Sequence, residues 1–112
     1  MVKSRTLKPG NPKRKMSQLD RLHRLKTEIY RIARQHNARK VYVFGSCARK
    51  EETQESDVDL LADFDDSASL FDQVALRLAL EETLNCKVDV IPLSSLADPV
   101  FGPMAKKDMV LL

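Results

Sequence analysis

Three aspartates, Asp57, Asp59 and Asp89, stand in segments that are otherwise apolar. Asp57 and Asp59 lie one residue apart in SDVDLLADF, and Asp89 lies inside KVDVIP. Side chains alternate across a strand, so Asp57 and Asp59 share one face and the apolar residues between them share the other. If the two segments are neighbouring strands with their apolar faces aligned, the three carboxylates meet on one patch.

Such a patch is unfavourable unless something positive fills it, because like charges repel each other and resist desolvation. Hard carboxylate oxygens suit Mg²⁺ or Mn²⁺. The alternative is that these are ordinary solvent-facing residues, with Asp57 simply beginning a strand. Aspartate is disfavoured in strands, however, so three on one expected face favour a metal site.

A second feature is FGSCAR, in which an apolar run meets Gly45 and Ser46. Glycine lets the backbone turn tightly and approach a ligand closely. A helix that begins near Ser46 would offer free N–H groups and a hydroxyl to phosphates, and Arg49 follows one turn later. Most Gly-Ser turns are only turns. Beside a carboxylate cluster, this one suggests a metal-bound nucleoside triphosphate.

Together these residues resemble the DNA polymerase β-like nucleotidyltransferase superfamily, and the short chain resembles its minimal nucleotidyltransferase branch. The likeness covers about residues 41–91: Gly45-Ser46-x-Ala48-Arg49, a polar linker, Ser56-Asp57-Val58-Asp59-Leu60-Leu61, and Asp89 in a later strand. It implies a small mixed β-sheet flanked by helices, as in the polymerase β palm. Lys50 departs from the pattern, because the family usually has glycine there.

The resemblance also implies a chemistry, which is ATP-dependent transfer of a nucleoside monophosphate to a hydroxyl. Gly45 and Ser46 would hold the triphosphate, and Asp57 and Asp59 would ligate two Mg²⁺ ions. Asp89 would ligate the metal nearest the acceptor and help activate its hydroxyl. Two ions about 4 Å apart stabilise the attacking and leaving oxygens of an in-line displacement.

Larger members of the superfamily carry extra domains that bind the acceptor, and 112 residues leave no room for one. Minimal members are often paired with HEPN-domain toxins, to which they add AMP on a tyrosine. The resemblance therefore implies the antitoxin of a type VII-like toxin–antitoxin pair. Two alternatives stay open: an antitoxin that only binds its partner, and a transferase acting on a small molecule or an RNA end.

The expected elements alternate between helix and strand, which is typical of an α/β or α+β fold. Apolar residues recur at helical spacing over 17–36, and Ser17 and Asp20 resemble a capping box. Strands are expected at 40–44, 56–64 and 87–92. The helix expected at 70–85 is apolar on two faces, one with Phe71 and the other with Leu80. It should be either deeply buried or covered by a partner.

Composition limits the remaining possibilities. The length fits one domain, expected over 17–112. Residues 1–16 hold six basic and no acidic residues, which favours a flexible arm. The rest of the chain is acidic, so the net charge of the whole chain is poor evidence for a nucleic-acid partner, and none is expected. No segment predicts a signal peptide or membrane span, so a cytoplasmic location is expected. Cys47 and Cys86 are expected to be free thiols.

Overall fold

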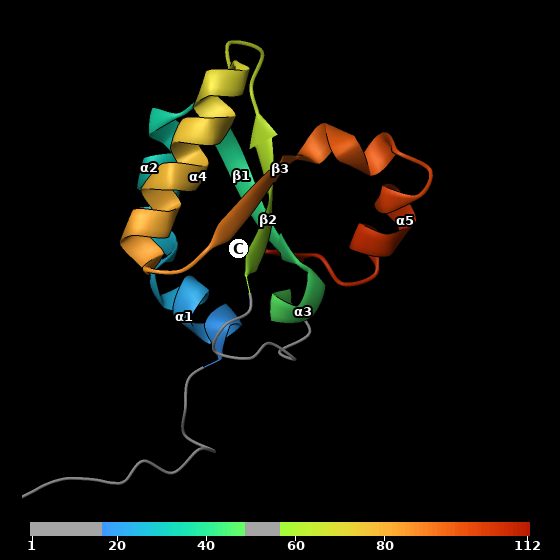
Figure 1. Ribbon diagram of the computed structural model, residues 1–112, viewed down its shortest axis with the longest axis horizontal. Helices are drawn as coiled ribbons and strands as arrows, with labels where there is room; N and C mark the ends of the chain where they lie inside the picture. Colours follow the sequence, from blue (N-terminus) through green and yellow to red (C-terminus); the bar gives the residue numbers. More distant parts are fainter. Residues whose placement is uncertain (1–16, 49–56) are drawn as a thin grey trace, which may run out of the picture.

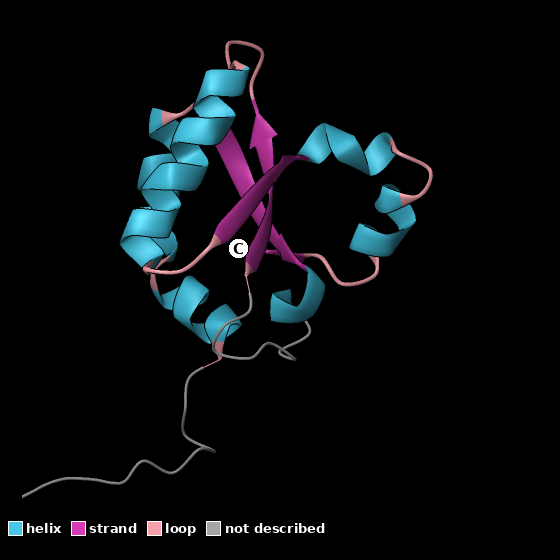
Figure 2. Cartoon of the chain, viewed as in Figure 1, coloured by secondary structure: helices cyan, strands magenta, loops and turns pink. Residues whose placement is uncertain are grey.

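The protein is a four-stranded mixed β-sheet with helices on both faces (Figures 1 and 2). The computed structural model describes residues 17–48 and 57–112, except for the side chain of Ser46. The strands are β1 (Ala38–Phe44), β2 (Val58–Phe64), β3 (Val88–Pro92) and β4 (Val110–Leu111). This confirms the predicted α/β class.

The strand order is β3-β2-β1-β4. β3 lies parallel to β2, whereas β1 is antiparallel to both β2 and β4. The parallel pair is connected by a helix, as parallel strands require. The sequence predicts only three of these strands, because β4 has two residues and shows no alternation.

The N-terminal helical segment is two helices rather than the single helix predicted over 17–36. They are α1 (Gln18–Arg24) and α2 (Lys26–Gln35), and Leu25 lies between them with φ −94° and ψ 11°. The Ser17 hydroxyl accepts a hydrogen bond from the Asp20 N–H at 3.1 Å, which confirms the capping role. The break lets α1 reach α4 (Leu70–Leu84), where Arg21 donates to the Leu84 carbonyl.

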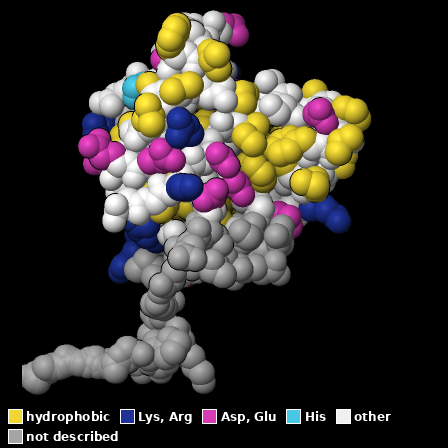
Figure 3. Space-filling model, viewed as in Figure 1, with side chains coloured by type: hydrophobic (Ala, Val, Ile, Leu, Met, Phe, Trp, Pro, Cys, Tyr) yellow, Lys and Arg dark blue, Asp and Glu magenta, His cyan; other side chains and the backbone are white. Residues whose placement is uncertain are grey.

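Helix α4 begins where the Asp72 carboxylate accepts from the Ser69 N–H at 2.9 Å, and it ends at Asn85, whose φ is +55°. Its buried face holds Leu76, Leu80 and Leu84. The opposite face is open to solvent, with Phe71 84% exposed and Leu78 52% exposed. Figure 3 shows hydrophobic side chains at the surface over α4. Of the two expectations for this helix, deep burial is therefore wrong for the chain alone.

The sheet separates two apolar cores. Helices α1, α2 and α4 cover one face, and the larger core there includes Val58, Leu60 and Ala62 of β2. On the other face Leu61 packs with Phe44 and Ala105. The alternation predicted along β2 is thus confirmed.

The second face is covered by the C-terminal segment, for which the sequence predicts no more than a helical turn. It forms η2 (Leu93–Ala97), α5 (Phe101–Lys106) and then β4. The rings of Phe44 and Phe101 meet edge to face, with centroids 5.5 Å apart. A Cβ on Gly102 would lie 2.1 Å from the Leu96 carbonyl oxygen, so the contact between α5 and η2 requires glycine. None of the described helices is long and apolar enough to cross a bilayer.

Candidate active site

The end of β1 and the beginnings of β2 and β3 meet at one end of the sheet, next to α3 (Gly45–Ala48) (Figure 1). We call this end of the sheet the carboxylate edge. Asp59 is central in this group. Its partner in the register on β1 is Phe44, and its partner on β3 is Asp89. Directly opposed residues on neighbouring strands point to the same face, so the carboxylates of Asp59 and Asp89 are neighbours. The predicted pairing of their strands is confirmed.

Asp57 is not part of the strand, although the sequence predicts that the strand starts before it. It lies immediately before β2, which begins at Val58, and it is exposed. The Val58 N–H donates to the Lys87 carbonyl at 3.0 Å and so fixes the start of the parallel pair. Asp57 therefore belongs to the entry of β2, next to the edge that carries Asp59 and Asp89.

The electrostatics of Asp59 show that the three acids influence one another. Partial burial raises the pKa of the Asp59 carboxyl above its ordinary value, and the negative charges of Asp89 and Asp57 raise it further. Both effects disfavour the ionised form. A cation at this edge would reverse the electrostatic part of that effect.

Gly45 brings the backbone against the same carboxylate. Its φ is +74°, which is a region that residues with a side chain rarely adopt. A Cβ at this position would lie 2.9 Å from Oδ2 of Asp59. The turn after β1 thus requires glycine both for its conformation and for the space beside Asp59. The short helix α3 that follows is held by Cys47, which is fully buried in the larger core.

The donor set fits a divalent cation by its chemistry, because the three carboxylates supply hard oxygen ligands next to a bare backbone turn. The side chains do not yet surround one point. Across residues 17–48 and 57–112, no three acidic, thiol or imidazole groups are placed to enclose a metal ion. The register of the strands brings Asp59 and Asp89 side by side, with Asp57 at the entry of β2.

The remaining predicted site residues are only partly described. The Ser46 backbone lies in α3, but its side chain is outside the described part of the chain. Arg49, Lys50 and residues 1–16 also lie outside the described residues. Neither Cys47 nor Cys86 forms a disulfide, which agrees with the expected thiols. Burial raises the pKa of the Cys86 thiol, which favours its protonated, unreactive form.

Comparison with known proteins agrees with this geometry. The family model described as polymerase beta, nucleotidyltransferase matches residues 27–112. The chain belongs to the polymerase beta nucleotidyltransferase family. The match covers every strand and all three candidate aspartates.

Two further similarities support the assignment of this chain to the nucleotidyltransferase family. A Methanocaldococcus jannaschii protein with the provisional name protein adenylyltransferase MJ0435 is 37% identical over 75 residues, covering 67% of this chain and 81% of the relative. The solved structure of a protein provisionally described as a minimal nucleotidyltransferase superposes with a TM-score of 0.72 at 34% identity, covering 84% and 95% of the two chains.

A third similarity is to a toxin–antitoxin complex. One chain of an MntA–HpeT mutant structure superposes on this nucleotidyltransferase with a TM-score of 0.62 at 25% identity. The superposition covers 78% of this chain and 70% of that one.

Two residues that hold β3 in place were not predicted as part of the site. The Glu81 Oε2 accepts from the Val88 N–H at 3.1 Å, and the Gln73 Nε2 donates to the Val90 carbonyl at 2.9 Å. These bonds bracket Asp89, so Glu81 and Gln73 hold the part of β3 that carries it. The sequence contains a signal for Gln73, because it stands at helical spacing from the buried Leu76 and Leu80 and is polar where an apolar residue would be expected on the buried face of α4.

Proposed function

We propose that this nucleotidyltransferase transfers AMP from ATP to a tyrosine hydroxyl of a HEPN-domain toxin and so acts as the antitoxin of a type VII-like pair. The observation that carries the proposal is the register that opposes Asp59 to Asp89 beside the glycine turn. The protein adenylyltransferase name of the M. jannaschii relative supports AMP as the group transferred. The MntA–HpeT complex supports a toxin as the partner.

In the proposed reaction, the acceptor oxygen forms a bond to the α-phosphorus of ATP. The bond from the α-phosphorus to the oxygen that bridges it to the β-phosphorus breaks, and pyrophosphate leaves with that oxygen. Asp89 is exposed on the edge strand β3, where it would take up the hydroxyl proton. Asp57, Asp59 and Asp89 would hold two Mg²⁺ ions. These ions supply charge neutralisation to the attacking and leaving oxygens.

The glycine turn has its own part in this proposal. With no Cβ, Gly45 lets the backbone at the start of α3 come close to the triphosphate, just as it lets Asp59 come close now. Ser46 and Arg49 follow as the proposed hydroxyl and guanidinium donors to phosphate. Positioning and neutralisation are most of what phosphoryl transfer requires of a protein, so a small set of residues suffices.

The proposed acceptor belongs to a separate protein, and the surface offers a place where a partner could bind. Phe71, Val74 and Leu78 form an exposed apolar face on α4. Exposed apolar faces of this kind mark protein interaction sites. The same face is the observation that favours the second candidate function, a binding antitoxin that blocks its toxin without chemistry.

The test is Mg²⁺-dependent transfer of labelled AMP from ATP to a co-expressed HEPN partner, with mass spectrometry of the modified tyrosine. Asp57→Asn and Asp59→Asn should each abolish the label. Asp63→Asn is the matched control, because it makes the same change farther along the face of β2 that carries Asp59 and should leave transfer intact.

Two results would contradict the proposal. Toxin neutralisation that persists in both inactive variants with no AMP on the toxin would establish the binding role. Turnover of the isolated chain with a small hydroxyl compound or an RNA end would establish the third alternative.

A further inference from the structure

A pocket of about 420 Å³ lies beside the beginning of β1, on the side of that strand that faces β4. It is formed where β4 ends and helix α2 passes over the edge of β1. We call it the basic pocket. Besides the end of β4, its lining residues are Lys26, Thr27, Tyr30, Arg34, Arg39 and Lys40.

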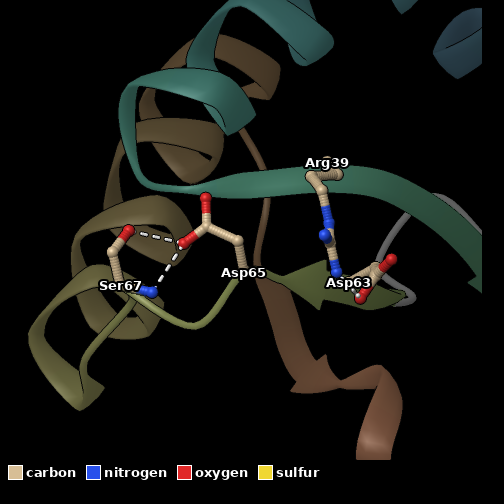
Figure 4. Close-up of polar contacts among 4 residues, drawn as sticks. All are labelled: Arg39, Asp63, Asp65 and Ser67. Atoms are coloured by element: carbon tan, nitrogen blue, oxygen red, sulfur yellow. Dashed lines mark hydrogen bonds and ion pairs between the residues drawn. The ribbon is translucent and has the colours of Figure 1, made fainter.

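The basic pocket gathers four cationic side chains and no acidic one. In the described part of the chain, Lys26, Arg34 and Lys40 make no ion pair. Arg39 pairs with Asp63 of β2 at 3.4 Å, but its side chain stays 63% exposed. Figure 4 shows the two side chains pointing toward each other from neighbouring strands. Such an exposed pair contributes little to stability and is easily exchanged for another anion.

Other arginines of the protein are arranged differently. Arg31 of α2 pairs with Glu28 one turn away, and Arg77 of α4 pairs with Glu81 at 3.1 Å. The basic pocket therefore brings together three cationic side chains without an ion pair in the described residues and a fourth, Arg39, whose pair with Asp63 is exposed. Like charges held near a concave wall attract anions strongly.

Tyr30 forms the fixed part of the basic pocket. Its hydroxyl accepts from the Val41 N–H at 3.1 Å and lies 3.3 Å from the Leu112 carbonyl, so it ties α2 to β1 and β4. The Lys26 ammonium lies 5.9 Å from the ring centroid, and the Arg34 guanidinium lies 6.0 Å from it. The ring thus holds two cations in place by cation–π attraction.

We propose that the basic pocket binds a compact ligand with two or more linked phosphates, such as the di- or triphosphate of a free nucleotide. Its volume is that of a small-molecule site. Arginine guanidinium groups bind phosphate oxygens in pairs, and the two lysines add point charges. Because cations already flank the Tyr30 ring, the pocket favours phosphates over stacked bases, which single-stranded RNA requires.

This site is distinct from the carboxylate site. Lys40 and Phe44 are four residues apart on β1, which corresponds to about 13 Å along the strand. The basic pocket also opens on the β4 side of β1, whereas Asp59 and Asp89 lie on the β2 and β3 side. The protein would therefore hold phosphates at two separate places.

Calorimetric titration of tripolyphosphate into the full chain tests the proposal. EDTA and low salt are used, because the carboxylate site repels anions when no divalent cation is present. Arg34→Gln combined with Lys40→Gln should weaken binding at least about tenfold, since it removes two charge-assisted contacts. The matched control is Lys106→Gln combined with Lys107→Gln, which removes the same charge from exposed residues at the end of α5 and should bind as the wild type does.

A second pair of titrations distinguishes the source of the phosphates. Tighter binding of ADP than of pyrophosphate supports a nucleotide ligand, and equal binding supports recognition of the phosphates alone. Three outcomes would overturn the proposal: no tripolyphosphate binding at millimolar concentration, equal loss of affinity in both double variants, or tighter binding of a single-stranded oligonucleotide at equal phosphate concentration. The readout involves no AMP transfer, so it is independent of the proposed reaction.

Discussion

The glycine turn beside Asp59 gives the sharpest test of the candidate site, through the substitution Gly45→Ala. At φ +74° a residue with a Cβ is strained by about 1–2 kcal/mol. The new Cβ would also start 2.9 Å from Oδ2 of Asp59, well inside an ordinary contact near 3.4 Å. The carboxylate must therefore swing away by about half an ångström, since the backbone of β2 is fixed by pairing on both sides.

Two effects follow from the substitution, one from the backbone strain and one from the displaced carboxylate. The unfolding temperature should fall by about 5–10 °C, at about 5 °C for each kcal/mol in a domain of this size. AMP transfer should fall by about 10- to 100-fold, because Asp59 is a proposed metal ligand and a misplacement of about 1 Å at a reaction site costs about 100-fold in rate. Thermal unfolding measured by circular dichroism and AMP transfer at a temperature where both proteins are folded separate the two effects.

Asn37→Ala is the matched control for Gly45→Ala. Asn37 also has a positive φ, +63°, but it precedes β1 at the end opposite to Gly45. Because Asn37 already carries a Cβ at positive φ, the variant adds only part of that strain, but it also loses the hydrogen bond from Asn37 Nδ2 to Asp72. It should be measurably destabilised and still transfer AMP at the wild-type rate. Transfer by Gly45→Ala within threefold of the wild type would refute the role given to this turn.

Three further outcomes are expected. Asp59→Asn, in EDTA at pH 7, should be more stable to urea than the wild type by less than about 1 kcal/mol, because the carboxyl is half-exposed. Burial and the charges of Asp89 and Asp57 raise the pKa of Asp59, so the wild type loses stability as the pH rises from the unfolded pKa of about 3.8 through the raised pKa. The stability advantage of the variant should therefore disappear on acidification. A variant that is less stable than the wild type at pH 7 would contradict this. Tyr30→Phe should cost about 1–2 kcal/mol in urea unfolding, because it leaves the Val41 N–H without its acceptor, and AMP transfer should not change. Leu80→Ala should cost about 2–5 kcal/mol in the free energy of unfolding, because it leaves a cavity in the core. Leu78→Ala, on the exposed face of the same helix, should change stability by less than about 0.5 kcal/mol and weaken binding of the proposed toxin partner.

The sequence predicts the central part of the fold because its signals there are local and strong. Alternation places Asp59 on the face of β2 opposite to Val58 and Leu60, and the structure has that arrangement. The parallel register of β2 and β3 is consistent with the alignment of the apolar residues Val58 and Val88, which are partners in the sheet. Burial of one face is what fixes such a register.

Other features could not be predicted because they depend on distant contacts. The break at Leu25 leaves the apolar spacing intact, and only the docking of Arg21 on Leu84 shows why the helix divides there. The bonds from Glu81 and Gln73 to β3 depend on how α4 crosses the sheet. The charge that gathers in the basic pocket comes from α2 and β1, whose residues are separated by the turn at Asn37.

The parallel pairing of β2 with β3 has a consequence for the order in which parts of this protein fold. The hairpin of β1 and β2 can form from nearby segments, but Asp89 arrives only when α4 and β3 close over the sheet, about thirty residues later in the chain. That closure moves a third negative charge toward two others, so it is the step most opposed by repulsion. Divalent cations should therefore slow amide hydrogen exchange chiefly in β3 and the last turns of α4, and this cooperative unit should be the first to open when they are removed.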